Sequence, residues 1–174
     1  LNAAVSVALT AGTANAAHLN IIDGLTTNLV NATAVTLLTG TAFELNNALD
    51  DQTTIDTAAN VAVTMSGAVG SVQVEASLLN AINANTTGLV NATAAGLIYG
   101  TAADVLNSMD SPAEMTVTGS VYAYIYDAQA AAADLNAIDA LTTTTVNANG
   151  VVGMMTGTSA AVWDAMDNQS TIDT

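Results

Sequence analysis

The chain has no lysine, no arginine and no cysteine, and among its 174 residues there is only one proline, one phenylalanine and one tryptophan. Without cysteine it can form neither disulfides nor thiolate sites. Without lysine or arginine it lacks the cations that bind nucleic-acid phosphates or make a basic patch on an anionic membrane. We therefore expect no nucleic-acid partner and no adhesion to a membrane through basic residues.

Charge of the opposite sign is present but sparse. Fifteen acidic residues and a single histidine give a net charge of −15, yet only 9% of the residues are charged. No apolar run reaches the roughly 18 residues that span a bilayer, so we expect no membrane insertion. A chain without lysine or arginine also offers trypsin-like proteases no cleavage site, which suits an exposed, extracellular protein.

One short sequence segment occurs three times along the chain. The segment Leu29–Thr33 returns unchanged as Leu89–Thr93 and more loosely as Val146–Asn149. Three repeat units, approximately 1–57, 58–115 and 116–174, account for the whole length. Such self-similarity is typical of a repeat array in which each unit covers its neighbour, so we expect a single array over 1–174.

The first half of each unit reads as a strand followed by a short helix. Runs rich in Val, Thr and Tyr predict strands at Val5–Leu9, Val61–Met65 and Val117–Ile125. Leu and Ile recur three positions apart in the segments that follow, which gives an inward apolar stripe. These segments predict helices at Ala16–Leu25, Glu75–Asn85 and Ala131–Leu141.

The second half repeats the same order. Strands are predicted at Val30–Leu38, Val90–Ile98 and Val146–Met155. Each is followed by a Gly-Thr pair, in which Gly permits a turn and Thr caps a helix. The helices are predicted at Ala42–Leu49, Ala102–Met109 and Ser159–Met166.

Strands that alternate with helices favour βα crossovers and parallel pairing. We therefore predict an α/β fold: a repeat solenoid of strand–short helix half-units, with one parallel sheet stacking along its length. A β-solenoid and a doubly wound α/β globule are the alternatives. A doubly wound globule would not require the same residues at the same phase three times, so the solenoid is preferred.

No group of residues predicts catalysis. His18 is the only histidine, and no Ser or Asp stands around it in a triad-like arrangement, so we expect a surface position and no enzyme activity. Asp50, Asp110 and Asp167 close the second helix of each unit and are weak candidates for Ca²⁺ ligands one repeat apart. Calcium-loop motifs are absent, however, and solvated acids are the preferred interpretation, with no cofactor expected.

Two further residue sets recur or cluster. Asn31, Asn91 and Asn147 share one repeat position and predict an internal amide ladder from layer to layer. Asn31 and Asn91 also fit the N-glycosylation pattern, which leaves attached glycans open. Tyr122, Tyr124 and Tyr126 alternate on one face of a strand in one unit only. We expect them to serve packing, with an adhesive patch as the alternative.

The amino-acid sequence of the third unit resembles repeats found in a known group of proteins. The run 133–143 followed by Val146–Ala148 is similar to the Ala/Thr/Asn/Asp-rich tandem repeats of very large secreted surface proteins of bacteria, cyanobacteria among them. The resemblance implies an extracellular or cell-surface location and a structural or adhesive role. Many such proteins carry calcium-binding nonapeptides, which this chain lacks, so calcium is not implied.

The phase of the repeat relates the two ends of the sequence. Thr57 is followed by Ala58–Asn60 and a strand, and the segment Leu1–Val7 resembles that continuation, whereas Thr174 ends in the phase of Thr57. Uncapped arrays tend to stack. We therefore expect head-to-tail association into an extracellular filament, sheath or surface layer. The alternative is an adhesin stalk or ligand-binding repeat segment of a large secreted protein.

Overall fold

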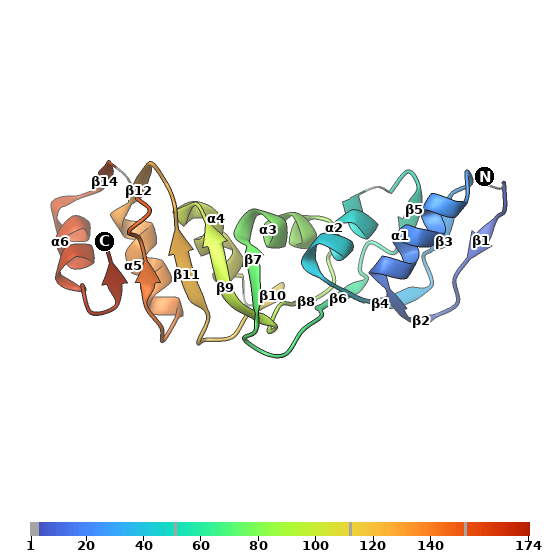
Figure 1. Cartoon of the computed structure of the whole chain (residues 1–174), viewed down its shortest axis with the longest axis horizontal. Coiled ribbons are helices and arrows are strands. Elements are labelled where there is room, and N and C mark those ends of the chain that lie inside the picture. The colour runs from blue at the N-terminus through green and yellow to red at the C-terminus, as the bar shows by residue number, and fades with distance from the viewer. Residues whose placement is uncertain (1–3, 51, 112, 152) are drawn as a thin grey trace.

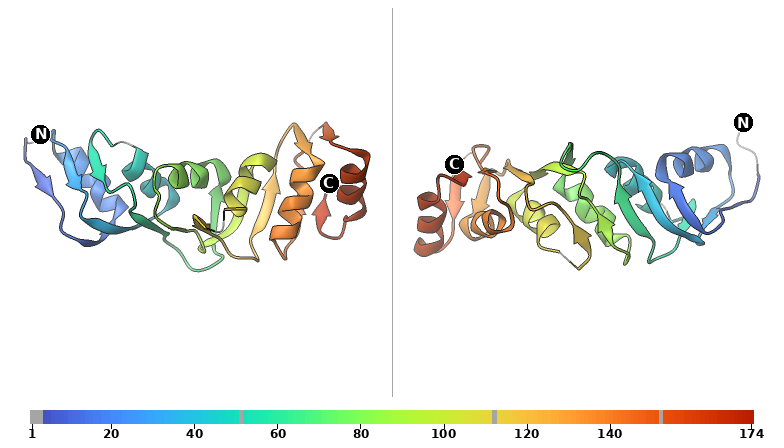
Figure 2. Two further views of the ribbon diagram at one scale, coloured as in Figure 1. Left: turned by 180° about the vertical axis from the view of Figure 1, so that it is seen from behind. Right: turned by 90° about the horizontal axis from the view of Figure 1, so that it is seen from below.

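The computed structural model describes residues 4–50, 52–111, 113–151 and 153–174, so the first three residues of the segment Leu1–Val7 lie outside it. In the described part the chain is elongated and α/β, with six helices and parallel strand pairs only (Figure 1). The helices contact one another in chain order, α1 with α2 and so on to α6. The strand β1 and the helix α6 lie at opposite ends in both views of Figure 2.

The six helices lie within one residue of their predicted ranges, which confirms those predictions. Their bounds are Ala16–Leu25 (α1), Ala42–Asp50 (α2), Ala76–Ala84 (α3), Ala102–Met109 (α4), Ala132–Leu141 (α5) and Ser159–Asp167 (α6). Each odd-numbered helix buries the expected leucine: Leu19, Leu79 or Leu135. No helix in the described residues is both long and apolar enough to cross a membrane.

The Gly-Thr pairs cap the even-numbered helices as predicted. The Thr101 hydroxyl accepts a hydrogen bond from the backbone N–H of Asp104, and the Thr158 hydroxyl accepts one from Ala161. At α2 the exchange is reciprocal, because Glu44 Oε2 also accepts from the Thr41 N–H at 2.8 Å. These bonds satisfy N–H groups that have no partner inside the helix.

The strands are shorter and more numerous than predicted. They are Val7–Ala8 (β1), Gly12–Asn15 (β2), Val30–Ala32 (β3), Val35–Gly40 (β4), Ile55–Thr57 (β5), Ala62–Met65 (β6), Val72–Glu75 (β7), Val90–Asn91 (β8), Ala95–Gly100 (β9), Met115–Thr116 (β10), Tyr122–Ile125 (β11), Gln129–Ala131 (β12), Val146–Asn147 (β13), Met154–Thr156 (β14) and Ile172–Asp173 (β15). The predicted single strand Val30–Leu38 is two strands, since Asn31 Oδ1 accepts from the Thr33 N–H and turns the chain between them.

The prediction of one continuous sheet is wrong. The described strands form four sheets, ordered β1-β3-β5, β10-β8-β6-β4-β2, β15-β13-β11-β9-β7 and β12-β14. Sequence patterns missed six of the described strands. Of these, β2, β7 and β12 run directly into helices, and β5, β10 and β15 are only two or three residues long, so all six carry little strand signal of their own. No single central sheet forms in the described residues, so the doubly wound globule is not the fold adopted.

Each five-stranded sheet joins two consecutive repeat units. Strands β2 and β4 come from the first unit, and β6, β8 and β10 come from the second or its end. The next sheet repeats the pattern with β7 and β9, then β11, β13 and β15. The connection between units is therefore one strand pair, β4 with β6 or β9 with β11.

Recurring hydrogen bonds establish which positions correspond between units. The hydroxyls of Thr26, Thr86 and Thr142 donate to the carbonyls of Val5, Val61 and Val121, respectively, at 2.6–2.7 Å. In the helices, Nδ2 of Asn20, Asn80 and Asn136 donates to the backbone carbonyl of Glu44, Asp104 or Ala161, each at 3.0 Å. The repetition is thus one of atomic contacts as well as of sequence.

We predict that Gly96→Ala lowers the free energy of unfolding by about 1–3 kcal/mol, the usual cost of overpacking. Gly96 is an extra residue in β9, and a Cβ atom there would collide with the Gly70 carbonyl oxygen. The control is Gly24→Ala in α1, where an added Cβ atom meets no other atom within 4 Å. Alanine already occupies the corresponding positions of the other two units, Ala84 and Ala140. Gly24→Ala should gain about 0.5–1 kcal/mol. Urea unfolding measures both, and equal effects would contradict the close approach.

Candidate functional site

His18 lies on α1 with an exposed side chain, in agreement with its predicted surface position. Its backbone N–H donates to Oδ1 of Asn15, which caps the helix. Among the described residues, its imidazole makes no hydrogen bond or ion pair with a nucleophile or a carboxylate. Within one chain, His18 is therefore an exposed side chain at the end of the molecule that carries β1.

The three repeated aspartates are exposed and separate. Asp50 and Asp110 belong to the ends of α2 and α4, and α3 packs between those helices. Asp167 ends α6. No group of three or more His, Cys, Asp or Glu residues that could hold a metal ion occurs in the described part of the chain. Asp50 shares a shallow hollow with Asp23, and the lining of this hollow also includes Asn20, Asn47 and Thr54.

The predicted amide ladder of Asn31, Asn91 and Asn147 is not what the structure forms. The three residues lie on β3, β8 and β13, each in a different sheet, so none neighbours another. Instead, each Oδ1 accepts a local backbone N–H two residues ahead, at 3.1 Å. The inter-layer amides are Asn20, Asn80 and Asn136, which recur as visibly in the sequence but lie on helices.

The tyrosines of β11 and its end lie on the outer face of their sheet. Tyr122, Tyr124 and Tyr126 are exposed, and Val121, Ala123 and Ile125 point inward and are buried. The rings are therefore not buried within the single chain, and packing against another molecule and an adhesive patch both stay predictions. Tyr99 of β9 is the register partner of Tyr124, so all four tyrosines of the chain share this face.

The fold raises the pKa of Tyr126. Local desolvation raises the pKa of its phenol above the ordinary value near 10, and the Glu75 carboxylate, which accepts its hydroxyl at 3.5 Å, raises that pKa further. Both effects disfavour the phenolate. The Tyr126 phenol therefore stays uncharged at neutral pH, next to the Glu75 carboxylate.

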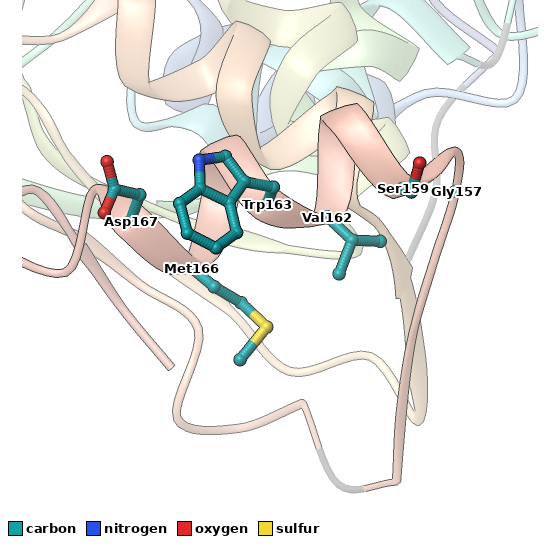
Figure 3. A pocket seen from close by; sticks show the side chains of 6 residues that line it. All are labelled: Gly157, Ser159, Val162, Trp163, Met166 and Asp167. Atoms are coloured by element: carbon teal, nitrogen blue, oxygen red, sulfur yellow. The ribbon is translucent and has the colours of Figure 1, made fainter.

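The end that carries α6 is an open apolar surface, the tail face. A hollow of about 560 Å³ is lined by Gly157, Ser159, Val162, Trp163, Met166 and Asp167. Figure 3 shows the side chains of Val162, Trp163 and Met166 projecting from α6 into this space. Met166 is 54% exposed, whereas the corresponding Met109 of α4 is 6% and Leu49 of α2 is 1% exposed. The next layer covers these positions inside the chain, and no described residue covers them here.

The opposite end is open in the same way and forms the head face. Val5 is 56% exposed, whereas the corresponding Val61 and Val121 are 1% and 0% exposed. Val7, Leu9 and Ile22 are also partly exposed, although their counterparts in the later units are buried. Among the described strands, only β3 pairs with β1 and only β12 pairs with β14, so each end also presents a free strand edge.

Comparisons of the chain with models of protein families, with curated proteins and with solved structures give no match. The two end faces and the tyrosine face are therefore the observations from which we infer a function.

We predict that Glu75→Gln lowers the pKa of Tyr126 only part of the way towards 10, because local desolvation remains. The unfolded chain loses this proton before the folded chain does, so the stability from Tyr126 is present below pH 10 and falls as the pH rises through the raised pKa. Absorbance titration of phenolate formation measures the shift, and Tyr126→Phe identifies the signal. An unchanged titration in Glu75→Gln would contradict the contact.

Proposed function

We propose that the chain is a repeat solenoid and serves as a structural subunit that assembles head to tail into a filament, sheath or surface layer. The observation that carries the proposal is the matched exposure at the two ends. At the tail face, Val162 and Met166 occupy positions that an inner layer buries, and at the head face Val5, Val7 and Leu9 do the same. Each face can therefore supply the layer that would cover the other.

Burial of these exposed side chains would favour association between copies. Burying one side chain such as Met166, Val5 or Leu9 contributes about 1.5–3 kcal/mol relative to leaving it exposed. Several such side chains lie on each face, together with the single tryptophan, Trp163, which is 66% exposed. Covering them also pairs the free edges of β1 and β14, which otherwise present unpaired N–H and C=O groups.

The chemistry of the chain supports a structural role over an enzymatic one. The larger hollows among the described residues lie at an end or between neighbouring layers, and none gathers a nucleophile, a base and an orienting group. The resemblance to repeats of secreted surface proteins supports an extracellular location, and so does a chain without lysine or arginine. No cofactor or metal is part of the proposal.

The tyrosine face favours a second candidate, an adhesin segment that presents a ligand-binding surface. Its positions depart from the repeat, since Tyr99 and Tyr124 stand where the first unit and β6 have Thr39 and Thr64. Head-to-tail stacking of copies does not require exposed tyrosines at one place in the array. In this case the chain would form short rods without assembling.

We predict that the purified chain associates reversibly with rising concentration and that its Trp163 fluorescence shifts to the blue as the ring becomes buried. Each copy carries a charge of −15, so added salt should strengthen association by screening the repulsion between copies. Light scattering and electron microscopy give the size and form of the product. Long fibres support the subunit, and short rods at every concentration and salt level would support the adhesin segment.

Met166→Glu should abolish this association and leave the unfolding temperature of the single chain unchanged, because Met166 is exposed there. The matched control is Ser77→Glu, which adds the same charge at an exposed position of α3, away from both ends. Assembly of Met166→Glu at wild-type concentrations would contradict the role of the tail face.

A further inference from the structure

The four sheets that the described strands form follow one pattern, and two of the four are incomplete. Each complete sheet has two strands from one unit and three from the next, as in β7 and β9 followed by β11, β13 and β15. The sheet β12-β14 contains only the first two strands of the pattern. The sheet β1-β3-β5 contains only the last three. Together they hold the five strands of one complete sheet.

We propose, on the basis of the head-to-tail function above, that β14 of one copy pairs in parallel with β1 of the next and completes a five-stranded sheet in the order β12-β14-β1-β3-β5. The partner is a second copy of this chain, and the junction reproduces the strand pairs that join the units inside it. The free edges of β14 and β1 are the two edges that this pattern leaves unpaired in the described structure.

The inner pairs fix the register of the junction. In β4–β6, Leu38 is opposite Val63 and Thr39 is opposite Thr64. In β9–β11, Ile98 is opposite Ala123 and Tyr99 is opposite Tyr124. The corresponding pairs between copies are Met155 with Val7 and Thr156 with Ala8.

A backbone hydrogen bond recurs at the end of each inner strand pair. The backbone N–H of Ser66 donates to the Gly40 carbonyl at 2.7 Å and that of Tyr126 to the Gly100 carbonyl at 3.2 Å. At the junction, the N–H of Thr10 therefore donates to the carbonyl of Gly157.

The helices follow from the same register. Because α2 contacts α3 and α4 contacts α5 across the inner junctions, α6 contacts α1 of the next copy. Between α4 and α5, Leu106 and Asp110 share a hollow with Asp134. The corresponding residues at the new junction are Trp163 and Asp167 of α6 and His18 of the next α1. The only histidine thus replaces an aspartate at the one place where two copies meet.

This arrangement adds an ionisable contact between copies. The charged groups placed against His18 by this register are Asp164 and Asp167 from α6 of the neighbouring copy. Asp23 on its own helix instead shares a hollow with Asp50 of α2. The segments around β1 and β14 that pack beside it carry no ionisable side chain. An imidazole N–H in this position can donate a hydrogen bond to one of the carboxylates of α6, so His18 strengthens the junction.

Disulfide trapping tests the register, because the natural chain contributes no cysteine. One preparation carries Thr156→Cys and the other carries Ala8→Cys, and they are mixed under copper-catalysed air oxidation. Opposed residues on paired strands have the Cα spacing that a disulfide needs. Ser6→Cys is the off-register control, since two residues shift the partner by about 6.6 Å along the strand. The double variant Thr39→Cys, Thr64→Cys is the positive control within one chain.

The expected result is at least tenfold more cross-linked dimer with Ala8→Cys than with Ser6→Cys. Fibres that form but cross-link better through Ser6→Cys, or through two Thr156→Cys chains, would overturn the register and leave the proposed function standing. Absence of any association would instead overturn the function itself.

A second readout uses His18→Ala. We expect His18→Ala to lower the association constant several-fold, because the hydrogen bond to the carboxylates of α6 is lost, with light scattering as the measurement. An association constant equal to that of the wild type would overturn the placement of His18 against α6, whatever the strand register.

Discussion

Pairing of strands across unit boundaries is the interaction on which the rest of this structure depends. A unit of this chain does not complete its own sheet, because two of its strands belong with the following unit and three with the preceding one. Parallel pairing of β4 with β6, and of β9 with β11, therefore connects units that would otherwise touch only through side chains. Helices stack in the same order because each is tied to these strands.

This division of the sheets explains the surface at each end. A sheet shared between units leaves an incomplete sheet wherever the sharing stops, and the core residues beneath it are left without cover. Met166 at one end and Val5 at the other are exposed for this reason, although their counterparts are buried. The composition is consistent with thin layers of this kind, since Ala, Val, Leu and Ile fill them and aromatic residues are few. The exposed tyrosines of β11 are an addition to this plan, on a face that stacking does not use.

The helices could be predicted from the sequence almost to the residue, because an apolar stripe and a capping threonine are local signals. Asp50, Asp110 and Asp167 were also placed at helix ends, and His18 on the surface. The sheet arrangement could not be predicted, because two-residue strands such as β8 or β13 carry no periodicity and their partners are set by the whole layer. Two sets of asparagines recur in the sequence, and recurrence alone favours neither as the ladder. The prediction chose Asn31, Asn91 and Asn147, whereas the structure shows that Asn20, Asn80 and Asn136 bridge neighbouring helices.

The central claim is that one sheet continues from copy to copy. Cryo-electron microscopy of assembled fibres tests it most directly, at a resolution that separates strands about 4.8 Å apart. We expect β14 and β1 of adjacent copies to lie side by side and parallel within a five-stranded sheet, with Trp163 buried against α1. Fibres in which copies meet through other surfaces, with the edges of β14 and β1 left free, would contradict it.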